Sequence, residues 1–183
     1  MSTPRVVTTM AAVLAGAALS LAPADHARAQ RIDPGARDIL SYRLTPDAIA
    51  RLRQVMLALD AYRAPSPEAV RPDVAMVTVL AMTGPYGGSF KDSHVQETSG
   101  TLDRGHPDLA DAVRRAGLTS REYVLAWITV LAAHPQVAAR RAGRSLETGV
   151  APENVAFVES HWADVDGLVR DLGQRVQQAR GGR

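Results

Sequence analysis

The fold class is decided by residues 152–176, which read PENVAFVESHWADVDGLVRDLGQRV. Pro152 and Glu153 suit the first turn of a helix, because proline needs no amide partner there and a carboxylate meets the positive helix end. Large apolar residues then recur at alternating steps of three and four, the spacing of one helix face: Val155, Val158, Trp162, Val165, Val169, Leu172 and Val176. We expect a single long helix here, with this seam packed against other helices of the chain or against a second copy.

A second amphipathic helix is predicted over residues 46–63. Thr45 can cap its first turn, Pro46 suits the first helical position, and an apolar stripe follows at helical spacing until Pro65. A helical spacing also continues over 66–81 and favours a helix, although the β-branched run at 77–79 would also suit a strand. These patterns predict two helices in the first half of the chain.

Two more helices are expected in the middle of the chain. A short one is predicted over 107–116, because Gly117 can end it in the left-handed conformation. Thr119 stands three residues before a glutamate, which is capping-box spacing and starts a longer helix. Pro135 removes an internal hydrogen bond and clashes with the preceding turn, so we expect this helix to kink or end near His134.

The remaining segments show no sustained period. Residues 84–106 are rich in glycine and polar residues, and we expect one long irregular loop there, a feature that in a compact domain is generally functional or poorly ordered. Residues 30–44 are expected to form an extended N-terminal arm. The chain is therefore predicted to be all-α, a compact bundle of four to five amphipathic helices in a single helical domain over 45–180.

Residues 1–29 resemble a secretory signal peptide. Arg5 precedes an almost uncharged stretch over 6–21, and the small-residue sequence Ala-Arg-Ala ends at Ala29. The apolar part is shorter than the roughly 20 residues that a membrane-spanning helix needs. We expect cleavage after Ala29 and a bacterial protein that is periplasmic or secreted, with no membrane span after cleavage.

Composition excludes several classes of function. The chain has no cysteine, so it can form neither a disulfide nor a thiolate metal site. Its formal net charge is +2, and loss of residues 1–29 lowers it further, because two arginines and one aspartate are removed. Such a balanced charge argues against a nucleic-acid partner.

A candidate ligand site lies on a second strip of the last predicted helix. Phe157, His161 and Asp164 follow helical spacing beside the apolar seam, so His161 and Asp164 can face each other as an acid–base or metal-binding pair. In the alternative interpretation Phe157 belongs to the core and Asp164 pairs with His161 at its margin. Tyr86 and His94, from the expected irregular loop, complete the candidate ligand-binding residues.

No catalytic residue, metal site or cofactor is predicted. Metal binding on a helix favours His-x-x-x-His or Glu-x-x-His spacing, and neither occurs in the sequence. Met56 and His161, on the first and last predicted helices, resemble the arrangement in helical periplasmic b-type cytochromes, which would imply a haem held without covalent bonds.

Three segments resemble a family of small exported bacterial helical proteins of unknown function. They are residues 44–47 (LTPD), 118–123 (LTSREY) and 152–158 (PENVAFV). The two Leu-Thr helix starts also resemble the Leu-Thr-x-x-Gln motif of small periplasmic stress chaperones, although Ala48 and Glu122 stand where that motif has glutamine. The resemblance implies an exported helical fold and names no activity.

The sequence favours an exported helical binding or interaction module, with chaperone-like binding as one form of it. Its partner would be an unknown protein or small molecule of the cell envelope, and the last helix could also pair with a second copy. The alternative is a small periplasmic metal- or haem-binding protein or enzyme that uses His161 and Asp164.

Overall fold

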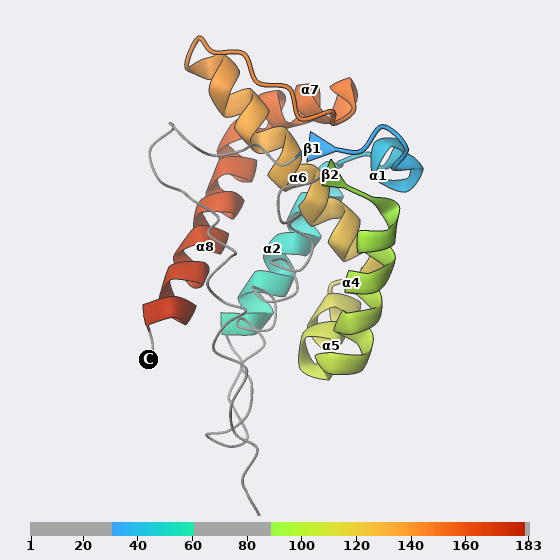
Figure 1. Ribbon diagram of the computed structural model, residues 1–183. Helices are drawn as coiled ribbons and strands as arrows, with labels where there is room; N and C mark the ends of the chain where they lie inside the picture. The colour runs from blue at the N-terminus through green and yellow to red at the C-terminus, as the bar shows by residue number, and fades with distance from the viewer. Residues whose placement is uncertain (1–30, 61–88, 182–183) are drawn as a thin grey trace, which may run out of the picture.

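The computed structural model describes residues 31–60 and 89–181, in which helices account for most of the chain (Figure 1). This confirms the predicted all-α class. In chain order the elements are β1 (Arg31–Ile32), α1 (Arg37–Ser41), α2 (Pro46–Asp60), β2 (Ser89–Phe90), α4 (Asp92–Gly105), α5 (Pro107–Arg115), α6 (Ser120–Arg141), α7 (Pro152–Ser160) and α8 (Trp162–Gly181). The helix predicted over 66–81 lies outside the described residues.

Helix α6 is the central element, and it crosses the middle of the molecule in Figure 1. It packs against α1, α2, α4, α5, α7 and α8. Its residues from Tyr123 to Val130 are all buried, so the helix is apolar on nearly every side. A helix that is apolar on nearly every side lies in the core of a domain, whereas a helix with a single apolar face lies at the surface and packs that face against the core.

Several helix ends agree with the sequence analysis. Thr45 Oγ1 accepts a hydrogen bond from the Ala48 amide (3.1 Å) at the start of α2. At the start of α6, Thr119 Oγ1 accepts from the Glu122 amide (3.1 Å) and the Glu122 carboxylate accepts from the Thr119 amide (2.8 Å). Gly117 follows α5 with φ of 77°, the left-handed conformation that glycine adopts without strain.

Of the two predicted effects of Pro135, an end of α6 near His134 was wrong. The helix continues through Pro135 to Arg141. Proline removes one internal hydrogen bond, but Ala132, Ala133 and Val137 are buried around it. Packing of this central helix outweighs a local penalty of about 3 kcal/mol.

The single long helix predicted from residue 152 is two helices. The chain leaves α7 at His161, with φ −111° and ψ 30°, and continues as α8 in another direction (Figure 1). Val155 and Val158 are buried in α7, and Val165 and Leu172 are buried in α8. The apolar spacing continues across His161, because this single residue changes the direction of the chain while apolar residues still recur every three or four positions on both sides of it.

The long irregular loop was also predicted wrongly where the structure describes it. Residues 92–105 form α4, whose buried face consists of Val95, Thr98 and Leu102. That face contains only two large apolar side chains, and Gly100 lowers the helix propensity, which is why the pattern is weak. Residues 84–88 lie outside the described residues.

The predicted extended arm is part of the fold. It contains β1 and α1, and it buries Ile32 and Ile39. β1 pairs in parallel with β2, and the Ile32 amide donates to the carbonyl of Thr148 (2.7 Å). These partners are distant in sequence, so no local pattern indicates them.

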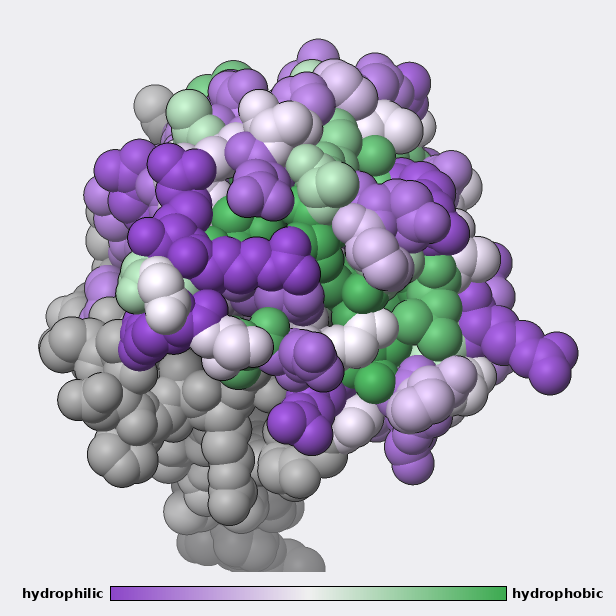
Figure 2. Space-filling model, turned by 90° about the horizontal axis from the view of Figure 1, so that it is seen from above, coloured by the Kyte–Doolittle hydropathy of each residue, from purple (hydrophilic) through white to green (hydrophobic). Residues whose placement is uncertain are grey.

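Seen from above, the described surface is mainly polar, with hydrophobic atoms in its middle and on the right (Figure 2). Much of this hydrophobic surface lies recessed between hydrophilic residues. Within the described ranges, none of the helices has the length and apolar composition needed to cross a membrane.

Candidate ligand-binding pocket

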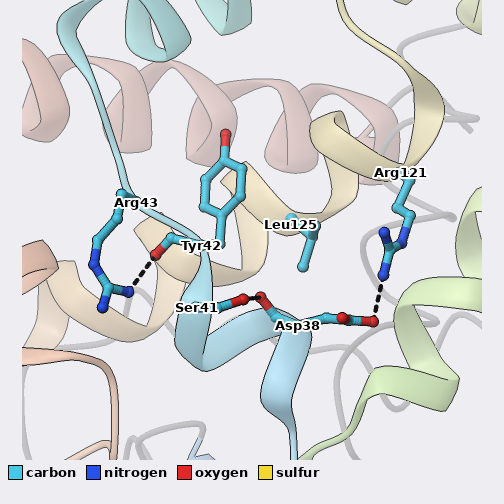
Figure 3. Close-up of a pocket in the computed structure, with 6 residues that line it drawn as sticks. All are labelled: Asp38, Ser41, Tyr42, Arg43, Arg121 and Leu125. Atoms are coloured by element: carbon cyan, nitrogen blue, oxygen red, sulfur yellow. Dashed lines mark hydrogen bonds and ion pairs between the residues drawn. The ribbon is translucent and has the colours of Figure 1, made fainter.

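A shallow pocket of about 390 Å³ lies between α1 and the first turns of α6 (Figure 3). Two of its lining residues, Arg121 and Leu125, stand one turn apart on α6. The others come from α1 and the residues that follow it: Asp38, Ser41, Tyr42 and Arg43. Its volume falls near the lower end of the range for small-ligand pockets, roughly 300–1,000 Å³.

Two guanidinium groups flank this pocket on opposite sides (Figure 3). Arg121 is paired with the carboxylate of Asp38 across the α1–α6 boundary. Arg43 donates to the carbonyl of Leu40 (2.6 Å) and lies 3.7 Å from the carboxylate of Glu153. The lining residues thus carry two positive charges and one negative charge.

Tyr42 lines the pocket between Arg43 and Leu125, and it contributes an aromatic ring and a hydroxyl (Figure 3). Burial, and secondarily the negative charge of Glu122, raises the pKa of Tyr42 to about 12. The phenol therefore stays protonated at physiological pH and can serve as a hydrogen-bond donor. Together with Leu125 it gives the pocket an apolar part.

The walls of the pocket are held by contacts that are distant in sequence. The carboxylate of Asp92 accepts hydrogen bonds from the amides of Asp38 (3.1 Å) and Ile39 (3.3 Å), and so caps the short helix α1. Asn154 of α7 accepts from the Leu44 amide (2.8 Å) and donates to the Tyr42 carbonyl (2.8 Å). The pocket residues are thus fixed in place from α4 and α7.

The predicted site residues of the last helix are not arranged as a facing pair. His161 Nδ1 lies 3.0 Å from the Phe157 carbonyl, and its ring stacks on Phe157 with centroids 4.3 Å apart. Asp164 pairs instead with Arg53 of α2 (3.6 Å). The structure brings Phe157 and His161 together and gives Asp164 a different partner, because His161 terminates α7.

Of the two candidates from the expected loop, only His94 belongs to the residues that the structure describes. His94 lies in the first turn of α4, where its Nδ1 accepts a hydrogen bond from the amide of Lys91 (3.2 Å). Tyr86 lies outside the described residues. Met56 is buried in the hydrophobic core.

The structure contains a carboxylate–imidazole pair that the sequence did not indicate. His134 Nε2 of α6 lies 3.0 Å from Asp166 Oδ1 of α8. The His134 ring also stacks on the Trp162 ring with centroids 4.8 Å apart. The Arg141 guanidinium lies 5.1 Å from the centre of the Trp162 ring. Within the described ranges, no three His, Asp or Glu side chains are grouped so that they could hold a metal ion.

Comparisons with protein-family models, curated proteins and solved structures found no match. The pocket geometry is therefore the basis for proposing a function.

The pocket residues were missed because the residues from Asp38 to Arg43 were assigned to an extended arm. The only usable sequence signal for the pocket was the capping box at Thr119. It marks the first turn of α6, and Arg121 lies in that turn. The His134–Asp166 pair joins two helices and has no sequence signature.

Proposed function

We propose that the protein is an exported, all-helical binding module, and that the pocket between α1 and α6 binds a carboxylate group. The observation that carries this proposal is the pair of guanidinium groups around a pocket with an apolar part. The ligand would be a small organic acid or the C-terminal end of a peptide, which share this chemistry.

The side chains of the pocket suit a carboxylate. Arginine presents planar donors that match the two oxygens of a carboxylate, and such charge-assisted bonds are the stronger ones in proteins. Arg121 Nη2 already pairs with one carboxylate oxygen of Asp38. A ligand carboxylate would compete with Asp38 for Arg121 while its apolar part contacts Tyr42 and Leu125.

The contacts from Asp92 and Asn154 favour a pocket that exists before binding. A pre-organised site loses little conformational entropy when the ligand arrives. The open, shallow shape favours a weak, rapidly exchanging ligand, as expected for a binding module that samples many partners.

The signal-like residues 1–29 support a location in the periplasm or outside the cell. A partner in the cell envelope, and chaperone-like capture of peptide ends, both agree with this compartment. Export can be tested by mass spectrometry of the N-terminus after expression in a bacterial host, where cleavage after Ala29 is expected.

Binding is tested with matched peptides and an arginine variant. Titration of the ¹⁵N-labelled protein with an N-acetylated tripeptide that has a free C-terminal carboxylate should shift the amide signals of α1 and the first turn of α6. The C-terminally amidated form of the same peptide should not.

Benzoate tests whether a small organic acid binds at the same place as the peptide carboxylate. Arg121→Gln should abolish the shifts, whereas Arg114→Gln, on the exposed side of α5 and paired with Asp111, should leave them unchanged. Equal shifts with both peptide forms, or no shift with any probe, would overturn the proposal.

A second variant predicts a gain of affinity. Asp38→Asn removes the internal competitor for Arg121, so the free-acid peptide should bind up to about fivefold more tightly, the equivalent of one exposed ion pair of roughly 1 kcal/mol. Weaker binding by a folded Asp38→Asn variant would contradict the role given to Arg121.

The His134–Asp166 pair supports a second candidate, a small enzyme or cofactor carrier. A carboxylate that accepts from an imidazole sets its tautomer and ring orientation, as acid–base or ligand chemistry requires. Native mass spectrometry of the protein from its own host tests this candidate. An excess mass that His134→Gln removes would support it, and a bare polypeptide mass would favour the binding module.

A further inference from the structure

The proposed carboxylate pocket has a positively charged group at each of its two ends. Arg43 follows α1 and Arg121 lies in the first turn of α6, and both side chains line the same pocket of about 390 Å³. Between them lie the ring of Tyr42 and the side chain of Leu125 (Figure 3). The pocket therefore presents two guanidinium groups that an apolar stretch separates.

Arg121 has donors to spare for a ligand. Its Nη2 pairs with one carboxylate oxygen of Asp38, and its side chain is 55% exposed. A guanidinium group carries five N–H donors, and one contact with Asp38 uses only one of them. A ligand carboxylate can therefore bind to Arg121 from the solvent side of the pocket.

Arg43 already has a carboxylate near it, held in a loose contact. Its Nη1 donates to the carbonyls of Leu40 (2.6 Å) and Tyr42 (3.1 Å), and its Nη2 lies 3.7 Å from the Glu153 carboxylate. The side chains of Arg43 and Glu153 are both largely exposed, and such ion pairs contribute little stability. Glu153 does not line the pocket. A ligand inside the pocket can therefore replace Glu153 without moving the pocket wall.

We propose that the ligand is a small dicarboxylate, an organic acid with a carboxylate at each end and an apolar middle. This inference rests on the proposed carboxylate pocket and assigns one ligand carboxylate to each arginine. One carboxylate binds Arg121 and the other binds Arg43, while the methylene groups between them contact Tyr42 and Leu125. A guanidinium group matches the two oxygens of a carboxylate, so each end of the ligand gains charge-assisted hydrogen bonds.

A series of straight-chain dicarboxylates from succinate to suberate tests the ligand class at constant pH and ionic strength. Binding is followed by the amide signals of α1 and the first turn of α6 in the ¹⁵N-labelled protein. The control at each length is the monoamide of the same acid, which keeps the size and one carboxylate. The best dicarboxylate should bind up to about fivefold more tightly than its monoamide, the gain expected from one exposed ion pair.

Two variants assign the second carboxylate to Arg43. Arg43→Gln should lower the affinity of the best dicarboxylate to that of its monoamide and leave the monoamide unchanged. Because Arg43 also binds carbonyls at the end of α1, Glu153→Gln is a second variant that keeps this arginine and removes its competing carboxylate. It should tighten the binding of the dicarboxylate and not of the monoamide. Arg140→Gln, exposed in the last turn of α6, is the matched control and should change neither affinity.

The outcomes separate this inference from the proposed function. Equal affinities of every dicarboxylate and its monoamide would overturn the dicarboxylate assignment and leave the carboxylate pocket intact. The absence of amide shifts with any of these acids would overturn both. A preference for dicarboxylates that neither Arg43→Gln nor Glu153→Gln changes would place the second carboxylate elsewhere and would also overturn the assignment.

Discussion

At the scale of single residues, the pocket depends on polar side chains that are distant in sequence from the residues they hold. Asn154 satisfies two backbone groups of the segment from Tyr42 to Leu44, and it is 1% exposed. A buried polar side chain in this position fixes the chain where hydrophobic contacts alone would leave several arrangements. The same residue therefore contributes to stability and to the shape of the pocket.

Asn154→Ala should lower the free energy of unfolding by about 2–3 kcal/mol, because it leaves the buried Leu44 amide and the Tyr42 carbonyl without their partner. Urea unfolding followed by circular dichroism measures the change. Gln96→Ala, on the exposed side of α4, is the control and should change the value by less than about 0.5 kcal/mol. A change that small for Asn154→Ala would show that water replaces the side chain.

At the scale of elements, α6 dominates, and its two unusual features have opposite effects on it. The Thr119–Glu122 capping box stabilises its first turn. Pro135 weakens its second half, yet the helix persists because it is buried on most sides. Both features predict measurable changes.

Pro135→Ala should raise the free energy of unfolding by about 1 kcal/mol, because the restored hydrogen bond outweighs the greater freedom of the unfolded chain. Pro152→Ala is the matched control. That proline occupies the first turn of α7, where no hydrogen bond is regained, so the variant should be neutral or slightly less stable. Destabilisation by Pro135→Ala would indicate that the proline ring itself is needed for packing.

Glu122 makes the α6 cap sensitive to acid. Hydrogen bonds from the backbone and side chain of Thr119, more than the nearby Arg51, hold the pKa of Glu122 below its ordinary value. A lowered folded-state pKa gives stability that is present above the unfolded-state pKa and lost as the pH falls through the folded-state value. Glu122→Gln should therefore flatten the loss of melting temperature in the acid range, whereas Glu97→Gln, on the exposed side of α4, should not. Parallel curves for Glu122→Gln and wild type would contradict this coupling.

At the scale of the whole molecule, local patterns identified the helices but not how they meet. The caps at Thr45 and Thr119 and the stop at Gly117 were correct because each depends on a few neighbouring residues. The break at His161 and the helix α4 were missed because tertiary contacts decide them. The pocket and the His134–Asp166 pair join residues from different elements, so a single sequence contains no direct signal for either.

The arrangement of α8 also predicts the oligomeric state. Val165, Leu168, Val169 and Leu172 are buried within the chain, so this part of the apolar seam is already covered. We expect a monomer for the protein without residues 1–29 at micromolar concentration, as measured by size-exclusion chromatography with light scattering. A stable dimer that Leu172→Ala dissociates would show that the seam pairs between copies instead.

The small β1–β2 pair has a consequence for the order of folding. Ile32 binds the backbone of Thr148, and Asp33 binds that of Phe90, so three distant parts of the chain meet at one point. Contacts of such long sequence separation form slowly, because a long loop must close first. During synthesis the contact with Thr148 cannot form until residue 148 has left the ribosome, so this meeting point is completed only after most of the chain exists. A chain that completes this contact so late would stay incompletely folded, and so able to pass through a secretion channel, for most of its synthesis.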